Sequence, residues 1–583
     1  MKLNTKNRYP LNARPTFSDR MKLAQLVGTR SLTSALWRLY ANPLLGLRLS
    51  GPVASELLIA PQDISTADMT RANEIYTGYF SFGGHTVNCR GASPFTMENM
   101  PIAWQRELHE FGWLKHLRAA ENSNARNQAR LFVDDWIRLN SKIKGLPWDV
   151  ECVAKRVIAW LCHSPLLLEG CEHKFYHRFM RSLTRQVRYL RLNIRNTPVG
   201  MPRLIVTIAL SYAAISMADN SSFIRKAIKR LDNELKAQIL PDGGHVSRNP
   251  NAVITLLALL MPLRQAIIGR DIVPSEILIG AIDRLVPALR FFRMGDGSFA
   301  LFNGMGDTPG DLVATLLSHD DAGGAPVLNA THSGYQRLMG DDVVLLMDTG
   351  KLPPPSLSYD MHAGCLSFEL SSGLERIVVN CGHLSEKNDG GDVERLAKII
   401  RSTAAHSTLS INEDSSCRFI TNKRLSAIAG TSVLSGPTHV EIDRSINDTD
   451  VSVSAEHDGY LASLGLKHQR SVSLSPVGIV LSGQDSLLLA DGRTPSKADK
   501  TPYHIRFHLH PFVTLELSSP RTVDLTLRSG QRWLFTCLTL DVRIEETMNF
   551  SDIFGMRAAS QIVLEGRVGE QSTVEWSFQK LAG

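Results

Sequence analysis

The pattern of apolar positions divides the chain into two parts. From residue 20 to about residue 320, apolar residues recur every three or four positions, as on the buried face of an amphipathic helix. The clearest helical segments are 204–217, 223–240, 252–268 and 277–292. Turn sequences rich in Pro, Gly, Asn and Asp separate them. This part is predicted to contain roughly ten or more helices joined by short connections.

From about residue 333 the apolar period changes to two, and β-branched residues, Gly, Ser and Asn become frequent. The predicted strands are 343–348, 365–370, 376–381, 407–412, 439–444, 505–510, 522–527 and 573–578. Because no long helix interrupts them, we expect antiparallel pairing, in a large sandwich or in stacked sheets. The boundary between the two parts falls in the loop-like sequence 320–329.

Composition and charge narrow the class of protein. The 583 residues are 43% hydrophobic and 21% charged, which excludes a disordered or collagen-like chain. No apolar run approaches the roughly 18 residues that suggest a membrane-spanning helix, and the first residues lack the apolar core of a secretory signal. The net charge of +7 is compatible with an acidic partner but too small to require nucleic acid. The eight cysteines include no C-x-x-C pair, so each is expected to be reduced and partly buried.

Arginines occupy one face of a predicted helix. Within 177–195 six of them are spaced three or four residues apart, at Arg178, Arg181, Arg185, Arg188, Arg191 and Arg195. One interpretation is the solvated face of an amphipathic helix. The other is an anionic groove, because guanidinium groups pair bidentately with carboxylate-like and sulfate-like groups.

Two loops and one strand carry further polar groups. The loop 241–250 joins two helical segments, and its two glycines and clustered polar side chains suit either a turn or the lining of a cavity. The glycine-rich loop 292–307 includes Asp296, Asn303 and Asp307. Alternation in the strand near residue 505 places three histidines and Arg506 on one face, which should therefore meet water, a carboxylate or a ligand. The motifs G-x-S-x-G and HEXXH are absent, as are a Walker loop and a G-x-G-x-x-G after a strand.

Three blocks resemble the heparinase II/III-like polysaccharide lyases. DGGHVSRNP at 242–250 is similar to the family loop D-G-[SG]-H-x-x-[RQ]-[SN]-P, and TAAHSTLSIN at 403–412 resembles the A-H-N-T-[VL]-x-[VI] strand. EHDGY at 456–460, followed by LKHQR at 466–470, is similar to a third block. The resemblance spans about 140–580.

This resemblance implies an α+β multidomain fold. An N-terminal α/α toroid, an incomplete helical barrel, would precede a large antiparallel β-sandwich or multi-sheet domain. The expected domains are a basic N-terminal segment at 1–60, helical in part, the toroid at 61–325 and the β domain at 330–583. The N-terminal segment is basic because the first fifty residues hold nine Lys and Arg against Asp19 alone.

The family cleaves uronic-acid polysaccharides by β-elimination, in which a base removes the proton α to the carboxyl group and an acid assists the leaving group. Hydrogen-bond donors or a cation neutralise the substrate carboxylate. The resemblance implies His406 and His245 as catalytic residues. It implies Asp242, Arg203, Arg248 and Asn249 as substrate-binding residues. The expected partner is an anionic polysaccharide or oligosaccharide, and no nucleic acid is expected.

The resemblance also implies a metal, usually zinc, that holds loops of the β domain near the site. His406 and His457 match positions that serve as metal ligands in related lyases. The acidic ligand expected between them has no match in 417–424, which contains no carboxylate.

Two other family positions differ in this chain. The catalytic tyrosine of the loop is replaced by Ala252, and an Asn-His pair that neutralises the carboxylate falls at Met201-Pro202. Arg203 is a candidate to replace the pair, and Tyr335, Tyr359 and Tyr460 are candidates to replace the base.

Three functions remain open from the sequence. The first is a lyase acting on a uronic-acid-containing glycan. The second is a catalytically impaired glycan-binding or envelope-assembly protein that keeps the lyase fold. The third is a nucleic-acid protein that uses the arginine helix. The missing signal predicts a cytoplasmic location, whereas the resemblance favours the periplasm or cell envelope.

Overall fold

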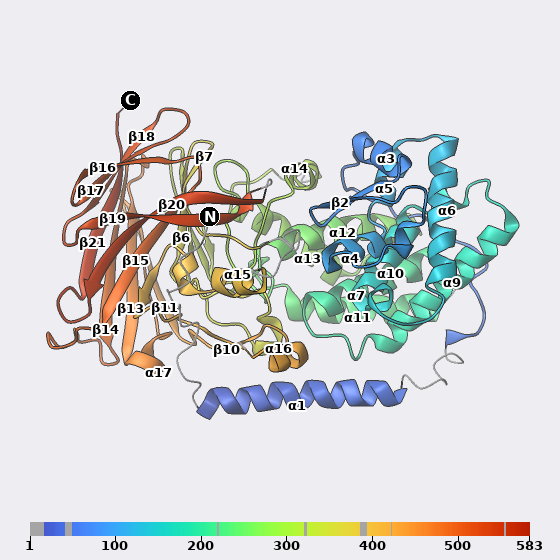
Figure 1. Cartoon of the computed structure of the whole chain (residues 1–583), viewed down its shortest axis with the longest axis horizontal. Coiled ribbons are helices and arrows are strands. Elements are labelled where there is room, and N and C mark those ends of the chain that lie inside the picture. The colour runs from blue at the N-terminus through green and yellow to red at the C-terminus, as the bar shows by residue number, and fades with distance from the viewer. Residues whose placement is uncertain are drawn as a thin grey trace.

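The computed structural model describes residues 17–40, 49–218, 221–319, 323–384, 393–420, 422–552 and 555–582. A helical domain and a β domain lie side by side along the long axis of the molecule (Figure 1). The last helix of the first part, α14 (Gly310–Ser318), is followed by strand β3 (Asn329–Ala330), after which strands predominate. The predicted fold class, helices followed by antiparallel sheets, is confirmed.

The helical domain consists mainly of helices that pack both on their neighbours in the chain and on helices further along it. Its helices are α3 (Met69–Tyr76), α4 (Ile102–Glu110), α5 (Leu114–Ala119), α6 (Ser123–Leu139), α7 (Val150–Cys162), α8 (Ser164–Leu168), α9 (His173–Asn193), α10 (Met201–Ser216), α11 (Ser221–Gln238), α12 (Asn251–Ile268), α13 (Glu276–Phe291) and α14. A short hairpin, β1 (Tyr79–Phe82) and β2 (His85–Asn88), lies between α3 and α4. Helix α10 packs against α7 and α11, and α12 packs against α13. The four clearest helical segments of the sequence correspond to α10–α13.

Polar side chains fix where several of these helices begin. The Asp149 carboxylate accepts hydrogen bonds from the N–H groups of Glu151 and Cys152 at the start of α7. The Ser275 hydroxyl accepts one from Leu278 at the start of α13. Such caps satisfy backbone donors that have no partner within the helix, so they fix the first turn.

Helix α12 is an apolar helix of the domain core. Among the described residues it is the one helix whose length and composition would let it cross a membrane. However, 61% of it is buried inside the protein, and Leu256, Leu257 and Leu260 have no exposed surface. This burial is what a core helix of a folded domain requires.

The β domain contains two large antiparallel sheets. The nine-stranded sheet has the order β19-β20-β15-β7-β6-β5-β4-β3, with β8 also paired to β15. Its strands are β3, β4 (Tyr335–Gly340), β5 (Val343–Asp348), β6 (Phe368–Ser372), β7 (Glu375–Val379), β8 (Leu409–Ile411), β15 (Pro502–Leu509), β19 (Val542–Asp552) and β20 (Gly555–Arg567). The eight-stranded sheet has the order β11-β12-β13-β14-β21-β18-β17-β16. Its strands are β11 (Val440–Ile446), β12 (Val451–His457), β13 (Leu466–Leu474), β14 (Val480–Leu489), β16 (Thr514–Ser519), β17 (Thr522–Thr526), β18 (Arg532–Cys537) and β21 (Thr573–Lys580).

The two sheets pack face to face around aromatic side chains. The Phe368 ring of β6 stacks on the Trp576 indole of β21, with ring centroids 5.5 Å apart. Phe507 of β15 meets the same indole edge-on at 4.8 Å. Because these side chains come from both sheets and are almost fully buried, the β domain is a sandwich with its own core.

The N-terminal helix α1 (Phe17–Tyr40) lies against the β domain. It contacts β10 (Val433–Ser435) and α16 (Lys423–Ala429), although more than 370 residues separate these segments in the chain. Figure 1 shows α1 running along the edge of the molecule. The Asp19 carboxylate is 1% exposed and pairs with the Arg418 guanidinium at 2.8 Å. Within the basic N-terminal segment at 1–60, residues 1–16 and 41–48 lie outside the described residues.

Candidate functional site

The loop 241–250 joins α11 to α12 and contacts the β domain. The Asp242 carboxylate accepts hydrogen bonds from the backbone N–H of Ser333 (2.7 Å) and from its hydroxyl (3.1 Å). Gly243 has φ +81°, and a Cβ at this position would lie 1.9 Å from the carbonyl oxygen of Arg284 in α13. Asp242 and Gly243 are therefore packed between α13 and the segment that leads into β4.

Arg248 of the same loop crosses the domain junction. Its φ is +64°, which is uncommon for a residue other than glycine. Its guanidinium pairs with the Asp348 carboxylate at the end of β5 and donates to the carbonyl oxygens of Ser333 (2.8 Å) and Gly334 (3.2 Å). The guanidinium also lies over the Tyr335 ring, 4.8 Å from its centroid. Burial opposes the charge of Arg248, but the Asp348 carboxylate raises its pKa, so the two side chains form a buried ion pair.

Asn303 extends this network toward the β domain. Its Nδ2 donates to the Tyr335 hydroxyl (2.7 Å) and to the Asp348 carboxylate (2.9 Å), and its Oδ1 accepts from the backbone N–H of His362 (3.2 Å). The Tyr335 hydroxyl in turn donates to the carbonyl oxygen of Arg248 (2.6 Å). Burial raises the pKa of Tyr335, so its phenol stays protonated at neutral pH.

Two buried imidazoles complete the junction. His406 Nδ1 is 2.7 Å from the Ser402 carbonyl oxygen, which can only accept, so this nitrogen is the donor. His406 Nε2 is therefore the acceptor in the neutral ring, and it is 3.1 Å from Nδ1 of His362. His362 Nε2 is then left as a buried acceptor with no hydrogen-bond partner among the described residues. Burial lowers the pKa of His406 to about 4, and burial followed by the repulsion of His406 lowers that of His362.

His245 lies within the helical domain, where both of its ring nitrogens have hydrogen-bond partners. Its Nδ1 accepts from the backbone N–H of Ser247 (3.1 Å) and contacts the Ser247 hydroxyl (2.7 Å). Its Nε2 donates to Oε1 of Gln238 in α11 (2.9 Å). Burial lowers its pKa to about 4. Because both ring nitrogens are bonded inside the protein, the imidazole holds the loop against α11.

The other two residues assigned to substrate are also bonded within the protein. Arg203 donates from Nε (3.1 Å) and Nη2 (2.7 Å) to the carbonyl oxygen of Thr197, in the turn before α10. Asn249 donates from Nδ2 to the Asp360 carboxylate (3.2 Å) across the junction. Asn249 therefore lies beside the Arg248 network, whereas the contacts of Arg203 are local.

His457 belongs to a separate network inside the β-sandwich. Its Nδ1 accepts from the N–H of Gly459 (3.0 Å), and its Nε2 is 3.4 Å from Nδ1 of His468. His468 Nε2 is 2.7 Å from the Asp485 carboxylate, which also pairs with Arg470 at 2.8 Å. All four ionisable side chains are almost fully buried, so this network ties β12, β13 and β14 together.

The zinc site implied by the resemblance does not fit these contacts. His406 and His457 lie in different hydrogen-bond networks, and each has both ring nitrogens engaged. In the part of the chain that the structure describes, no group of three or more His, Cys, Asp or Glu side chains is arranged to hold a metal ion. Two imidazoles that are already bonded give a weak site, because structural zinc needs about four free ligands.

The residues at the divergent family positions lie at the starts of two helices. Ala252 is 4% exposed in the first turn of α12. Met201 and Pro202 begin α10 and are half-buried. Tyr335 is at the junction, but its hydroxyl is held by Asn303 and by the carbonyl oxygen of Arg248.

The structure thus brings together only some of the predicted site residues. Arg248, Asn249 and His406 lie at the junction, Asp242 contributes its carboxylate there, and His245, Arg203 and His457 have partners elsewhere. Sequence reasoning missed Asp348 and His362. Asp348 ends a strand that is otherwise fully apolar, and a carboxylate in such a strand indicates a buried cationic partner. His362 lies in a loop without a recognisable motif.

Comparison with known proteins agrees with this architecture. Residues 322–577 match the heparinase II/III-like C-terminal domain family. FtsZ-localized protein C of Caulobacter vibrioides is 30% identical over 545 residues, which are 92% of each chain.

Solved structures of lyases have the same fold. A crystal structure of heparinase III superposes with a TM-score of 0.70 at 13% identity, covering 97% of this chain and 92% of the other. The heparan sulfate lyase HepC from Pedobacter heparinus gives a TM-score of 0.59 at 14% identity, covering 97% of this chain and 89% of the other. At these identities the likeness shows the fold alone. Together with the near full-length relative, these matches establish that the chain belongs to the heparinase II/III-like family.

Proposed function

We propose that this protein keeps the polysaccharide-lyase fold as a binding scaffold without β-elimination activity, and that it works together with FtsZ. The observation that carries the proposal is the 30% identity to FtsZ-localized protein C over 92% of both chains. Similarity along nearly the whole length includes both domains and the junction between them.

The chemistry of the junction supports the absence of catalysis. β-Elimination needs a positioned base and acid, together with donors that neutralise the substrate carboxylate. Here the buried cation, Arg248, is already neutralised by Asp348. The phenol of Tyr335 is bonded on both sides, and its raised pKa disfavours the deprotonated form that a base needs. Arg248 and Tyr335 instead hold the two domains together, and His406 is bonded within the β domain.

A joint experiment tests both parts of this proposal. A fluorescent fusion of the full chain should coincide with FtsZ in dividing cells, and the purified protein should sediment with FtsZ polymers. Incubation with a panel of uronate polymers should give no rise in the ultraviolet absorbance of the unsaturated product. A product that forms with the wild type and disappears with His406→Ala would overturn the non-catalytic proposal. Absence of both coincidence and co-sedimentation would overturn the association.

One contact favours a lyase as the second candidate. His362 Nε2 is a buried acceptor without a hydrogen-bond partner among the described residues, next to His406. This Nε2 is able to accept a hydrogen bond from a ligand, although burial and the repulsion of His406 lower the pKa of His362. In this alternative, His362→Gln would abolish product formation from an anionic glycan, while His439→Gln, at an exposed histidine of the β domain, would leave it unchanged.

The location that we propose depends on the proposed association with FtsZ. Of the two locations considered from the sequence, we propose the cytoplasmic one for the scaffold and keep the cell envelope for the lyase alternative. Fractionation of cells that produce the untagged protein separates the two.

A further inference from the structure

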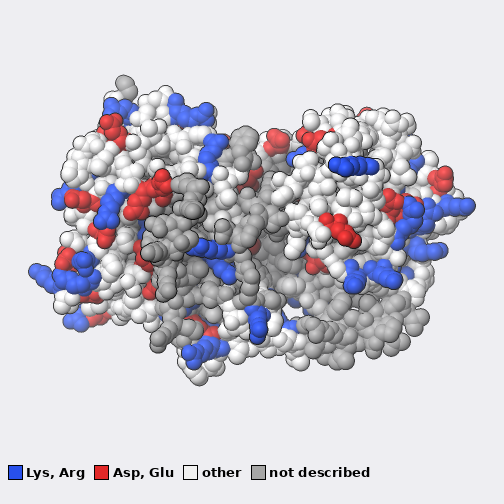
Figure 2. Space-filling view, in the orientation of Figure 1, with Lys and Arg blue, Asp and Glu red and all other residues white. Residues whose placement is uncertain are grey.

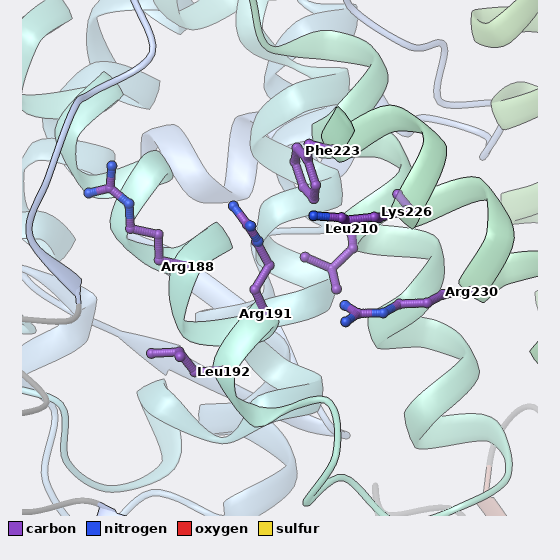
Figure 3. Close-up of a pocket in the computed structure, with 8 residues that line it drawn as sticks. Arg188, Arg191, Leu192, Leu210, Phe223, Lys226 and Arg230 are labelled. Atoms are coloured by element: carbon purple, nitrogen blue, oxygen red, sulfur yellow. The ribbon is translucent and has the colours of Figure 1, made fainter. Parts of the chain in front are cut away.

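A cavity outside the domain junction lies between α9, α10 and α11. Its volume is about 450 Å³, within the range of roughly 300–1,000 Å³ typical of small-ligand sites. Four cationic side chains line it: Arg188 and Arg191 of α9, and Lys226 and Arg230 of α11. Figure 3 shows Arg191, Lys226 and Arg230 extending toward a shared space from two facing helices. No Asp or Glu is among the lining residues.

The charges of these four side chains are not neutralised by carboxylates within the described residues. Arg188 donates to the carbonyl oxygen of Leu49 (3.0 Å) and to that of Pro52, and neither acceptor carries a charge. Burial, and after it the nearby charge of Arg191, lower the pKa of Arg188. Cations that crowd together in this way repel one another, so an anion placed between them would be bound favourably.

Other arginines of α9 have partners outside the cavity. Arg178 pairs with the Asp134 carboxylate at 2.8 Å. Arg185 donates to the Ser141 carbonyl oxygen (2.6 Å) and lies over the Trp148 ring. The arginine face of the helix is therefore divided: its first part binds α6 and the segment after it, and its last part lines the cavity.

An apolar floor orients the cationic groups. The Arg191 guanidinium lies 4.8 Å from the centroid of the Phe223 ring, and Leu210 of α10 lines the base of the cavity. Stacking on an aromatic ring restricts the guanidinium while leaving its N–H groups free to donate at the edge.

On the face in Figure 2, acidic and basic side chains are interspersed over the β domain, and several basic ones lie at the end of the helical domain away from the sheets.

We propose that this cavity binds a compact polyanion that carries phosphate or sulfate groups. A phosphate group brings about 1.5–2 negative charges and three acceptor oxygens into a small volume, which suits several converging N–H donors better than one carboxylate does. Three helices line the cavity, and it is open to solvent, with Arg191, Lys226 and Arg230 exposed at its rim, so it accommodates a small molecule or the end group of a larger one. This site goes beyond the proposed function, since none of its residues belongs to the domain junction.

Calorimetric titration of the full chain tests the site with two probes, inorganic tripolyphosphate and a sulfated disaccharide, in buffer of about 0.15 M ionic strength. Binding of tripolyphosphate assigns the site to phosphorylated ligands, and tighter binding of the disaccharide assigns it to sulfated glycans. The double variant Lys226→Gln/Arg230→Gln should weaken binding by about tenfold or more, since it removes two charge-assisted donors.

The matched control is Arg225→Gln/Lys229→Gln. It removes the same charge from the same helix at exposed positions that do not line the cavity. Its affinity should stay within about twofold of the wild type, because exposed charges further from the ligand are screened. The proposal is overturned if neither probe binds the wild type, or if the two double variants lose affinity equally.

Discussion

The guanidinium of Arg248, in the helical domain, is paired with the carboxylate of Asp348, in the β domain, and both side chains are buried at the domain junction. The pair joins a loop between two helices to the end of a strand one hundred residues further along the chain. The fold is that of the polysaccharide lyases, but Arg248 of the loop motif stabilises the contact between the two domains.

Removing one member of this pair should strongly destabilise the protein. Arg248→Met leaves Asp348 as an unpaired buried carboxylate, which is expected to lower the free energy of unfolding by about 3–5 kcal/mol. Arg248→Met/Asp348→Leu removes both charges and should recover part of the loss. Denaturant unfolding measures both. As a control, Arg493→Met breaks a pair whose side chains are 80% and 48% exposed and should cost no more than about 1 kcal/mol. Wild-type stability of Arg248→Met would contradict the role of the pair.

Acid should destabilise the fold through its buried histidines. Burial lowers the pKa of His245 and of His406 to about 4, against about 6.5 in an unfolded chain. Between these values the unfolded state binds more protons, so stability is complete above about pH 6.5 and falls as the pH drops toward about 4. Each histidine contributes a slope of at most about 1.4 kcal/mol per pH unit.

The pH dependence of unfolding in the variant His245→Gln checks this slope. In the variant, the loss of unfolding free energy between about pH 6.5 and pH 4 should decrease by the contribution of one proton. Replacing His439, whose side chain is 84% exposed, by Gln is the control for the loss of an imidazole at the surface. A His245→Gln protein with the full wild-type slope would show that this histidine is not held neutral by the fold.

The glycine of the loop motif should be required for packing. Gly243→Ala adds a Cβ that would meet the carbonyl oxygen of Arg284, at a φ of +81°. Left-handed strain and overpacking together predict a loss of about 2–5 kcal/mol, measured by thermal or denaturant unfolding. Gly170→Ala is the control, because its φ is also positive and nothing lies within 4 Å of its added Cβ. Equal losses in both variants would mean that the contact with α13 is unimportant.

Zinc should not stabilise the protein. His406 and His457 use their ring nitrogens in separate networks, so added zinc finds no prepared set of ligands. Thermal unfolding of chelator-treated protein, with and without zinc, should give the same midpoint. An increase in the midpoint with zinc that His406→Gln abolishes would establish the site implied by the family.

The charged face of the strand near residue 505 shows how a pattern translates into contacts. The sequence predicted that its histidines and Arg506 would meet water, a carboxylate or a ligand. In the structure, Glu413 is that carboxylate for His504 and Arg506: it lies 3.1 Å from both His504 Nδ1 and Arg506 Nη2. His508 is instead buried beside the Thr547 hydroxyl (3.0 Å) and the Ala404 carbonyl oxygen (3.0 Å). Period two places these side chains on one face, but the partner comes from a turn that only the folded chain brings near.

Local patterns determined the order of helices and strands, because the repeat of apolar residues depends only on neighbours a few positions apart. The sequence also determined the loop 241–250, because Gly243 there has a positive φ and a Cβ at this position would meet the carbonyl oxygen of Arg284. Only the tertiary structure decided which ionisable groups became partners: Arg248 with Asp348, His406 with His362, and His457 with His468. Burial makes an unpaired charge or donor costly, so each such group is fixed by whichever distant segment packs against it.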